Sequence, residues 1–440
     1  MSRVMEWYEL WTKDPFFDEA TRSELLAIAD RPEEIEDRFY RDLAFGTAGM
    51  RGLLGAGTNR MNRYTVARAA DAFARFIKSK GEAACERGIV ISYDSRHFSS
   101  EFAFLTAQIF VGHHIRVRFS DELRPVPLLS FAIRHYGAEG GVMITASHNP
   151  PQYNGFKAYG ADGSQLLPEE ADAIVRLMEE TSDFRKLQWP SESEVRASPL
   201  FLVIGPDLDQ AYDAMALKLS INPEVVRRHH DMKIVYTPLH GCGNKPVRRL
   251  LSAMGFSQVL VVREQELPDP DFSTVKTPNP EEREALSMAI ELALQSQAEL
   301  VIATDPDADR TGLCVRTKDG QYMVLSGNQI GLLLSDYILS AHTERNTMPD
   351  KPFVVTTIVS TKLMRKVAAF YGVTLFECLT GFKYIGELIK EKDEFGDMHF
   401  LFGFEESYGY LAGTEVRDKD AVVTSMLIAE MAAACRDKGL

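Results

Sequence analysis

The sequence predicts an α/β protein made of three related mixed-sheet domains around a central cleft. The chain has 440 residues, enough for about three domains of ordinary size. Short apolar segments typical of strands alternate with segments of helical spacing, which predicts parallel or mixed sheets covered by helices. In each third, one strand runs into a loop dense in reactive side chains. Because ligands bind beyond the carboxyl ends of strands in open α/β sheets, we expect these three loops to face one cleft.

The elements of the first third are the strands 89–93 and 141–145 and the helix 99–111, which Ser99 or Ser100 can cap. The middle third repeats the plan with the strands 233–236, 258–262 and 300–303 and the helices 245–254 and 280–297. The last third repeats it again with the strands 353–358, 374–378 and 399–402 and the helices 362–371 and 420–435.

Polar connections near residues 181–197 and 318–320 suggest where the domains end. We therefore predict domains at 1–200, 201–320 and 321–440, each with one of the three reactive loops.

Composition excludes several classes of protein. No segment reaches the roughly 20 apolar residues of a membrane span, and Glu430 interrupts the apolar run 422–435. The net charge of −14 argues against a nucleic-acid surface. The N-terminus has no apolar signal region. The five cysteines are scattered without a CxxC pair, so we expect buried free thiols in a reducing cytoplasm.

The loop of the middle third contains Asp305, Asp307 and Asp309, followed by Arg310. Three carboxylates at alternating positions repel one another, and Pro306 keeps them out of a helix interior. A cation relieves the repulsion, and oxygen ligands without His or Cys favour magnesium or calcium. A calcium-binding EF-hand loop does not fit, because the positions that require glycine and glutamate hold Arg310 and Arg316 here. The alternative is a solvated acidic turn.

The loop of the first third is Thr145-Ala146-Ser147-His148-Asn149-Pro150. It lacks the Gly-x-Ser-x-Gly pattern of a serine hydrolase. We do not expect a Ser147–His148 dyad, because neighbouring side chains of an extended chain point to opposite sides. A hydroxyl beside a metal site instead suggests phosphoryl transfer, in which magnesium stabilises charge on the serine oxygen. The alternative is a loop serine with a local hydrogen bond.

Several cations can hold a phosphate, although each could also be an ordinary surface charge. Arg51 lies in the glycine-rich segment 45–52, whose amides can approach an anion. Glu405 and Glu406, in the loop of the last third, can bond sugar hydroxyls. The other candidate cations are Lys157, Arg310, Lys383, Arg417 and Lys419.

These motifs resemble the α-D-phosphohexomutase family, closest to its phosphoglucomutase/phosphopentomutase-like branch. The segments 145–150, 305–310 and 403–407 match in order and spacing, and the likeness covers essentially the whole chain.

The resemblance implies that Ser147 carries the phosphate and that Asp305, Asp307 and Asp309 bind magnesium. It implies that Glu405 and Ser407 read the sugar hydroxyls. It also implies that Lys157 and His148 assist proton transfer or phosphate contact and that Arg51 lies at the active site.

The expected reaction interconverts glucose 1-phosphate and glucose 6-phosphate through phospho-Ser147 and glucose 1,6-bisphosphate. The alternatives are a phosphopentomutase or phosphomannomutase, an aspartate-nucleophile phosphatase using Asp305 and Asp307, and a non-catalytic sugar-phosphate binding protein. Family members carry a fourth domain that grips the distal phosphate, and this sequence ends at Leu440 before it. We therefore expect reduced turnover. We also expect a monomer or weak dimer.

Overall fold

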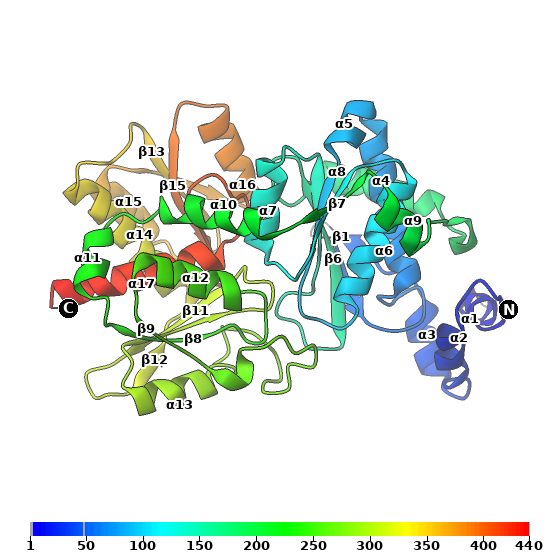
Figure 1. Cartoon of the computed structure of the whole chain (residues 1–440), viewed down its shortest axis with the longest axis horizontal. Helices are drawn as coiled ribbons and strands as arrows, with labels where there is room; N and C mark the ends of the chain where they lie inside the picture. Colours follow the sequence, from blue (N-terminus) through cyan, green and yellow to red (C-terminus); the bar gives the residue numbers. More distant parts are fainter. Residues whose placement is uncertain (1–2, 47–48, 440) are drawn as a thin grey trace.

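The computed structural model describes residues 3–46 and 49–439. Figure 1 shows three sheet-containing units, with the first and the N-terminus on the right and the other two on the left. Helix α17 (Ala421–Asp437) lies between the second and third sheets. Its N-cap is Asp420, whose carboxylate accepts the backbone N–H groups of Val422 and Val423. The three α/β units have the predicted architecture.

The first unit is built on a seven-stranded sheet in the order β1-β2-β6-β5-β3-β4-β7. The strands are β1 (Phe45–Gly46), β2 (Gly49–Leu53), β3 (Ile89–Tyr93), β4 (Val117–Ser120), β5 (Gly140–Ile144), β6 (Tyr153–Gly160) and β7 (Phe201–Ile204). Strand β7 pairs in parallel with β4, so this sheet extends to Ile204 and passes the boundary at residue 200 that the sequence predicted.

Helices cover this sheet, and the N-terminal three pack around Trp11 as part of the same apolar core. The helices are α1 (Arg3–Lys13), α2 (Glu19–Leu26), α3 (Pro32–Phe39), α4 (Arg63–Ser79), α5 (Glu82–Arg87), α6 (Ser99–Gly112), α7 (Val126–His135), α8 (Pro168–Glu180), the 3₁₀ turn η1 (Phe184–Lys186) and α9 (Glu192–Ala197).

The second sheet has five strands in the order β12-β11-β10-β8-β9. Its strands are β8 (Lys233–Thr237), β9 (Gln258–Val261), β10 (Leu300–Thr304), β11 (Thr311–Arg316) and β12 (Tyr322–Val324). The accompanying helices are α10 (Pro206–Leu217), α11 (Pro223–Arg228), α12 (Asn244–Met254), the 3₁₀ turn η2 (Arg263–Gln265) and α13 (Ser287–Ser296).

The third sheet has four strands in the order β14-β13-β15-β16. Its strands are β13 (Pro352–Thr357), β14 (Thr374–Cys378), β15 (His399–Glu405) and β16 (Gly409–Ala412). The helices before α17 are α14 (Gly327–Glu344), α15 (Met364–Tyr371), α16 (Phe382–Ile389) and the π-helical turn η3 (Lys390–Glu394).

All three sheets position their reactive loops in the same way. A strand that pairs in parallel with its neighbour on one side ends in the loop, and the next strand returns antiparallel beside it. The pairs are β5–β6, β10–β11 and β15–β16. Each loop is therefore pinned at both ends by a hydrogen-bonded ladder, which limits its freedom.

Two local predictions differ from the structure. Helix α6 is capped by neither Ser99 nor Ser100: its N-cap is Phe98 in a left-handed conformation, and Ser99 Oγ donates to Asp94 instead. The helix predicted over 280–297 is shortened to α13. Residues before it stay irregular where the Pro280 backbone packs against Gly312, whose hypothetical Cβ would lie 2.5 Å from the Pro280 oxygen.

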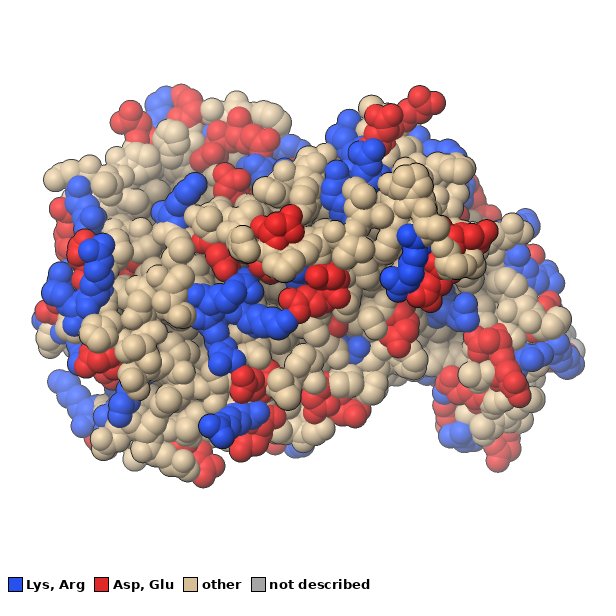
Figure 2. All heavy atoms as spheres, viewed as in Figure 1, with Lys and Arg blue, Asp and Glu red and all other residues tan. Residues whose placement is uncertain are grey.

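The surface carries acidic and basic side chains interspersed on the face shown in Figure 2. On α12, for example, Arg249 pairs with Asp213 at 2.7 Å. No helix in the described ranges is long and apolar enough to cross a membrane. The five cysteines are free thiols, but Cys435 is exposed, so the expectation that all of them are buried is wrong.

Candidate active site

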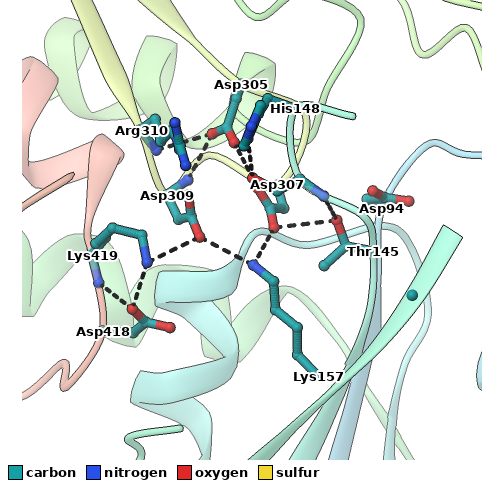
Figure 3. A network of polar contacts seen from close by, with 12 residues as sticks. Asp94, Thr145, His148, Lys157, Asp305, Asp307, Asp309, Arg310, Asp418 and Lys419 are labelled. Carbon is teal, nitrogen blue, oxygen red and sulfur yellow. Dashed lines mark hydrogen bonds and ion pairs between the residues drawn. The ribbon is translucent and has the colours of Figure 1, made fainter. Parts of the chain in front are cut away.

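The three reactive loops meet at a cluster of carboxylates on the loop after β10. Asp305, Asp307 and Asp309 are buried, and one oxygen from each lies within 4.8 Å of the others. Figure 3 shows Asp307 and Asp309 turned toward Lys157 on β6, with Asp305 on the side of His148. The sequence prediction that these three acids form one site agrees with this geometry.

The donor set fits a bound cation. Oδ1 of Asp307 and Oδ1 of Asp309 are buried and accept no hydrogen bond from the described residues. A buried carboxylate oxygen without a partner is costly, and a hard dication bound by oxygen ligands removes that cost. Burial and the neighbouring charges of Asp307 and Asp309 raise the pKa of Asp305 well above its ordinary value. The three acids could therefore hold a metal ion together.

The backbone of the acidic loop is bonded to all three units. Its carbonyl groups accept N–H groups from the start of α7, from the segment before α12 and from the first residue of α17. The bonds are Val126 N to Asp307 O at 2.9 Å, Cys242 N to Pro306 O at 2.7 Å and Ala421 N to Ala308 O at 3.2 Å. Relative movement of the units therefore strains the carboxylate cluster directly.

Ser147 lies at the edge of this cluster. Its hydroxyl donates to Asp305 Oδ2 at 2.7 Å. His148 Nδ1 lies 3.2 Å from the same hydroxyl oxygen, so the expectation that the two side chains diverge is wrong. Ser147 has a φ of 53°, and this left-handed backbone places neighbouring side chains on the same side. The serine is thus within reach of both a carboxylate and an imidazole.

Each reactive loop contains a non-glycine residue in the left-handed region. These residues are Ser147, Ala308 and Tyr408, with φ values of 53°, 48° and 63°. Such a conformation costs about 1–2 kcal/mol per residue and persists where surrounding contacts impose it. Its occurrence in all three loops indicates that the sheets and interdomain bonds hold the loops in strained shapes.

Two lysines from different units neutralise the acids. Lys157 Nζ lies 2.7 Å from Asp307 and 3.1 Å from Asp309, and Lys419 Nζ lies 3.4 Å from Asp309. Burial alone would raise the pKa of Asp309, but Lys157, Lys419 and Arg310 together lower it. Burial opposes the charge of Lys157, yet Asp307 and Asp309 raise its pKa. Both lysines therefore stay protonated beside the carboxylates.

Arg310, Arg51 and His148 form the other side of the site. Burial, together with the charges of Arg310 and Arg51, lowers the pKa of His148 to about 3, so the imidazole is neutral near pH 7. Arg51 is exposed and donates to Asn149 Oδ1 at 2.8 Å. Arg310 pairs with Glu281, a residue that the sequence analysis did not identify. Thr47 and Ala48, between Gly46 and Arg51, lie outside the described residues.

The remaining predicted residues divide into two groups. Glu405 at the end of β15 is buried, which raises the pKa of its carboxyl, and Ser407 beyond it is half-buried. Lys383 at the start of α16 is also buried, and burial lowers its pKa. Arg417 differs, because its guanidinium is buried against Glu394 at 2.9 Å and the carbonyl of Thr414 at 2.8 Å. This placement favours a structural role for Arg417 over contact with substrate.

Arg96 is a further residue of the site that the sequence analysis missed. Its buried guanidinium donates to four carbonyl oxygens of the serine loop and the start of β6 at 2.5 to 3.1 Å. It also pairs with Asp94 at 3.3 Å and lies over the ring of Phe272 at 4.9 Å. The four acceptors are Ser147, Asn149, Pro150 and Tyr153. The signal was available, because Asp94-Ser95-Arg96 follows the carboxyl end of β3, as the other reactive loops follow their strands.

Replacing Arg96 by lysine is expected to slow phosphorylation of Ser147 at least tenfold. Lysine keeps the charge beside Asp94, but it cannot reach four diverging carbonyl groups, so the strained loop loses its support. The measurement is the rate of phosphoserine formation from a sugar bisphosphate. Arg118→Lys is the control, because Arg118 donates to a single carbonyl, that of Arg87, which precedes the amino end of β3 and so lies away from the serine loop. An unchanged rate in Arg96→Lys would contradict this role.

Fold and site together define a phosphoryl-transfer enzyme with a serine beside a buried carboxylate cluster. Family models described as phosphoglucomutase/phosphomannomutase alpha/beta/alpha domains I, II and III match residues 42–185, 212–320 and 326–439. A phosphoglucomutase of Staphylococcus haemolyticus is 41% identical over 405 residues, which cover 92% of this chain and 71% of the relative. A Staphylococcus aureus phosphoglucomutase is 37% identical over 96% of this chain and 74% of the relative.

A solved structure of the phosphoglucomutase pp63/parafusin from Paramecium superposes with a TM-score of 0.70. The superposition covers 91% of this chain and 72% of the Paramecium chain. Because the sequence identity is 17%, this likeness supports the fold alone. The chain belongs to the phosphoglucomutase/phosphomannomutase family of the α-D-phosphohexomutases.

Proposed function

We propose that this enzyme interconverts glucose 1-phosphate and glucose 6-phosphate through phospho-Ser147. The observation that carries the proposal is the position of the Ser147 hydroxyl, 2.7 Å from Asp305 in a buried acidic cluster. A hydroxyl in that place can carry a phosphoryl group whose charge a bound cation offsets. The relatives named phosphoglucomutase, at 41% and 37% identity, support the choice of reaction.

In the proposed half-reaction, one phosphoryl group moves from Ser147 to a hydroxyl of the sugar monophosphate. The phosphorus–Oγ bond of phospho-Ser147 breaks, and a bond forms from phosphorus to the free hydroxyl oxygen of the sugar monophosphate. That hydroxyl loses a proton and Ser147 Oγ gains one. Our candidates to assist these transfers are His148, a neutral imidazole 3.2 Å from Oγ that can accept a proton, and Lys157, a protonated amine that bonds Asp307 and can donate one. The bisphosphate then reverses and returns its other phosphate to Ser147.

We propose magnesium as the ion at Asp305, Asp307 and Asp309, with Ser147 beside it. When bound, it supplies positive charge to the moving phosphoryl group and to the serine oxygen. The free Oδ1 atoms of Asp307 and Asp309 support this assignment. Arg310 and Arg51 are proposed to hold phosphate oxygens, with the Arg310 guanidinium oriented by Glu281.

Sugar recognition is assigned to the third unit. Glu405 and Ser407 would bond the hydroxyls, while Lys383 and Lys419 would contact the substrate from the same side. Glu406 suits this task less well, because its carboxylate already accepts Thr357 Oγ1 at 3.0 Å. The substrate is a small phosphosugar, with glucose 1,6-bisphosphate as intermediate and activator. We also propose a cytoplasmic location, which the exposed free thiol of Cys435 supports, and a monomer or weak dimer.

The proposal is tested with the half-reaction alone. Incubation with glucose 1,6-bisphosphate and magnesium is expected to place one phosphate on Ser147 and to release glucose monophosphate. Peptide mapping by mass spectrometry locates the phosphate. Binding of the sugar without labelling would instead favour a non-catalytic sugar-phosphate binding protein.

Hexose phosphates are expected to be better acceptors than pentose phosphates. Once Ser147 is phosphorylated, dephosphorylation by glucose 1-phosphate should have a higher kcat/KM than dephosphorylation by ribose 1-phosphate, because Glu405 and Ser407 gain contacts with the additional hydroxyl. Mannose 1-phosphate serves as the comparison among hexoses. The reverse order for glucose and ribose would favour a phosphopentomutase.

A further inference from the structure

The segment between β16 and α17 belongs to the third unit but is bonded to the first. Arg417 N–H donates to Ser130 Oγ on α7 at 2.9 Å. The neighbouring Asp418 is buried and accepts from Tyr159 Oη on β6 at 3.0 Å and from Gln165 Nε2 at 2.8 Å. Two side chains of the first unit therefore fix one carboxylate of the third.

The two oxygens of Asp418 face different groups. Oδ2 accepts both bonds from the first unit, and Oδ1 accepts the backbone N–H of Lys419 at 2.8 Å and its Nζ at 3.0 Å. Figure 3 shows Asp418 beneath Lys419, whose ammonium group points toward Asp309. Asp418 thus connects Tyr159 and Gln165 to the lysine that reaches the carboxylate cluster.

Neighbouring residues leave the side chain of Lys419 little room for another conformation. Its ammonium group lies 5.4 Å from the ring centre of Phe382. Its stem passes Gly409, where a hypothetical Cβ would lie 2.2 Å from Lys419 Cδ. Tyr159 is fully buried, and burial together with Asp418 raises the pKa of its phenol well above the usual value, so it stays a donor. Every group in this chain of contacts is therefore held in one arrangement.

We propose that Asp418 is a positioning residue for Lys419, and that Tyr159 and Gln165 set its position. Lys419 of the third unit then reaches the carboxylate cluster only while the first and third units are in contact. Contact between these two units therefore determines whether the positive charge of Lys419 lies beside Asp309. The inference rests on the proposed function only for its effect on the rate, because the contacts themselves are independent of the reaction.

The rate experiment is a double-mutant cycle with Tyr159→Phe and Lys419→Met. Phosphoserine formation from glucose 1,6-bisphosphate should slow about tenfold in Tyr159→Phe, with KM changed less than threefold, because one hydrogen bond to a charged group is lost. Tyr159→Phe should add nothing in the Lys419→Met background, since both changes act through the same lysine. Equal losses in both backgrounds, or no loss at all, would overturn the proposal.

Magnesium binding gives a second readout that does not need catalysis. A lysine 3.4 Å from Asp309 opposes a dication there, so Lys419→Met should bind magnesium several-fold more tightly. Tyr159→Phe should change the affinity in the same direction and add nothing to Lys419→Met. Unchanged affinity in Tyr159→Phe, measured by titration calorimetry, would contradict the coupling.

Tyr322→Phe is the matched control for both readouts. Its buried hydroxyl donates to the backbone carbonyls of Ala293 in α13 and of Ala298 just after it, away from the three loops. It should leave the rate and the affinity unchanged, so a loss in this variant would mean that removal of any buried hydroxyl disturbs the protein and would count against the proposal. If the unaltered chain forms no phosphoserine, the proposed function fails, and the magnesium cycle still decides the role of Tyr159.

Discussion

Ser147→Ala is expected to abolish phosphoryl transfer, with a loss of at least a thousandfold. The substitution removes the only oxygen of the protein that this mechanism phosphorylates, and neighbouring groups cannot replace a covalent carrier. The fold should survive, because the lost hydrogen bond to Asp305 contributes only about 1 kcal/mol to stability. The measurement is phosphate incorporation from labelled glucose 1,6-bisphosphate, with the thermal unfolding midpoint recorded alongside.

Ser335→Ala is the control for this variant. Ser335 is also buried and bonds the carbonyl of Gly331 on α14, so its loss tests the cost of removing a buried hydroxyl elsewhere. Retention of label in Ser147→Ala would point to an aspartate nucleophile. Treatment with hydroxylamine then distinguishes the two, because an aspartyl phosphate is cleaved and a phosphoserine is not.

Asp307→Asn is expected to weaken magnesium binding by about tenfold or more. The amide keeps the shape of the side chain but removes the charge of a hard oxygen ligand at the centre of the cluster. Lys157 also loses one of its two carboxylate partners, which leaves more positive charge near the ion. Titration calorimetry on both proteins measures the change, and phosphoserine formation should fall with magnesium occupancy.

The matched control is Asp319→Asn. Asp319 is an exposed acid of the same unit whose carboxylate bonds Thr317, so the net charge changes equally without touching the cluster. Its magnesium affinity should equal that of the unaltered chain. Equal affinities in Asp307→Asn and the unaltered chain would refute the metal assignment.

The sequence determined the three reactive loops, because each is a contiguous motif that follows a strand. Asp305, Asp307 and Asp309 are two positions apart, so local spacing alone predicts a shared site. The strands β3, β8 and β14 begin where the apolar pattern predicted. Strands β6, β11 and β16 were missed, because an antiparallel return strand is identified by its pairing partner rather than by its own composition.

Tertiary structure decided which side chains support the loops. Ser147 and Asp305 are 158 positions apart and Tyr159 and Asp418 are 259 apart, so no local pattern joins them. Arg417 and Lys419 look alike in the sequence, yet one is buried against Glu394 and the other reaches Asp309. The reason is geometric. The two residues lie on an irregular segment with a bend at Asp418, so the direction of each side chain depends on which unit packs against it, and sequence spacing carries no record of that packing.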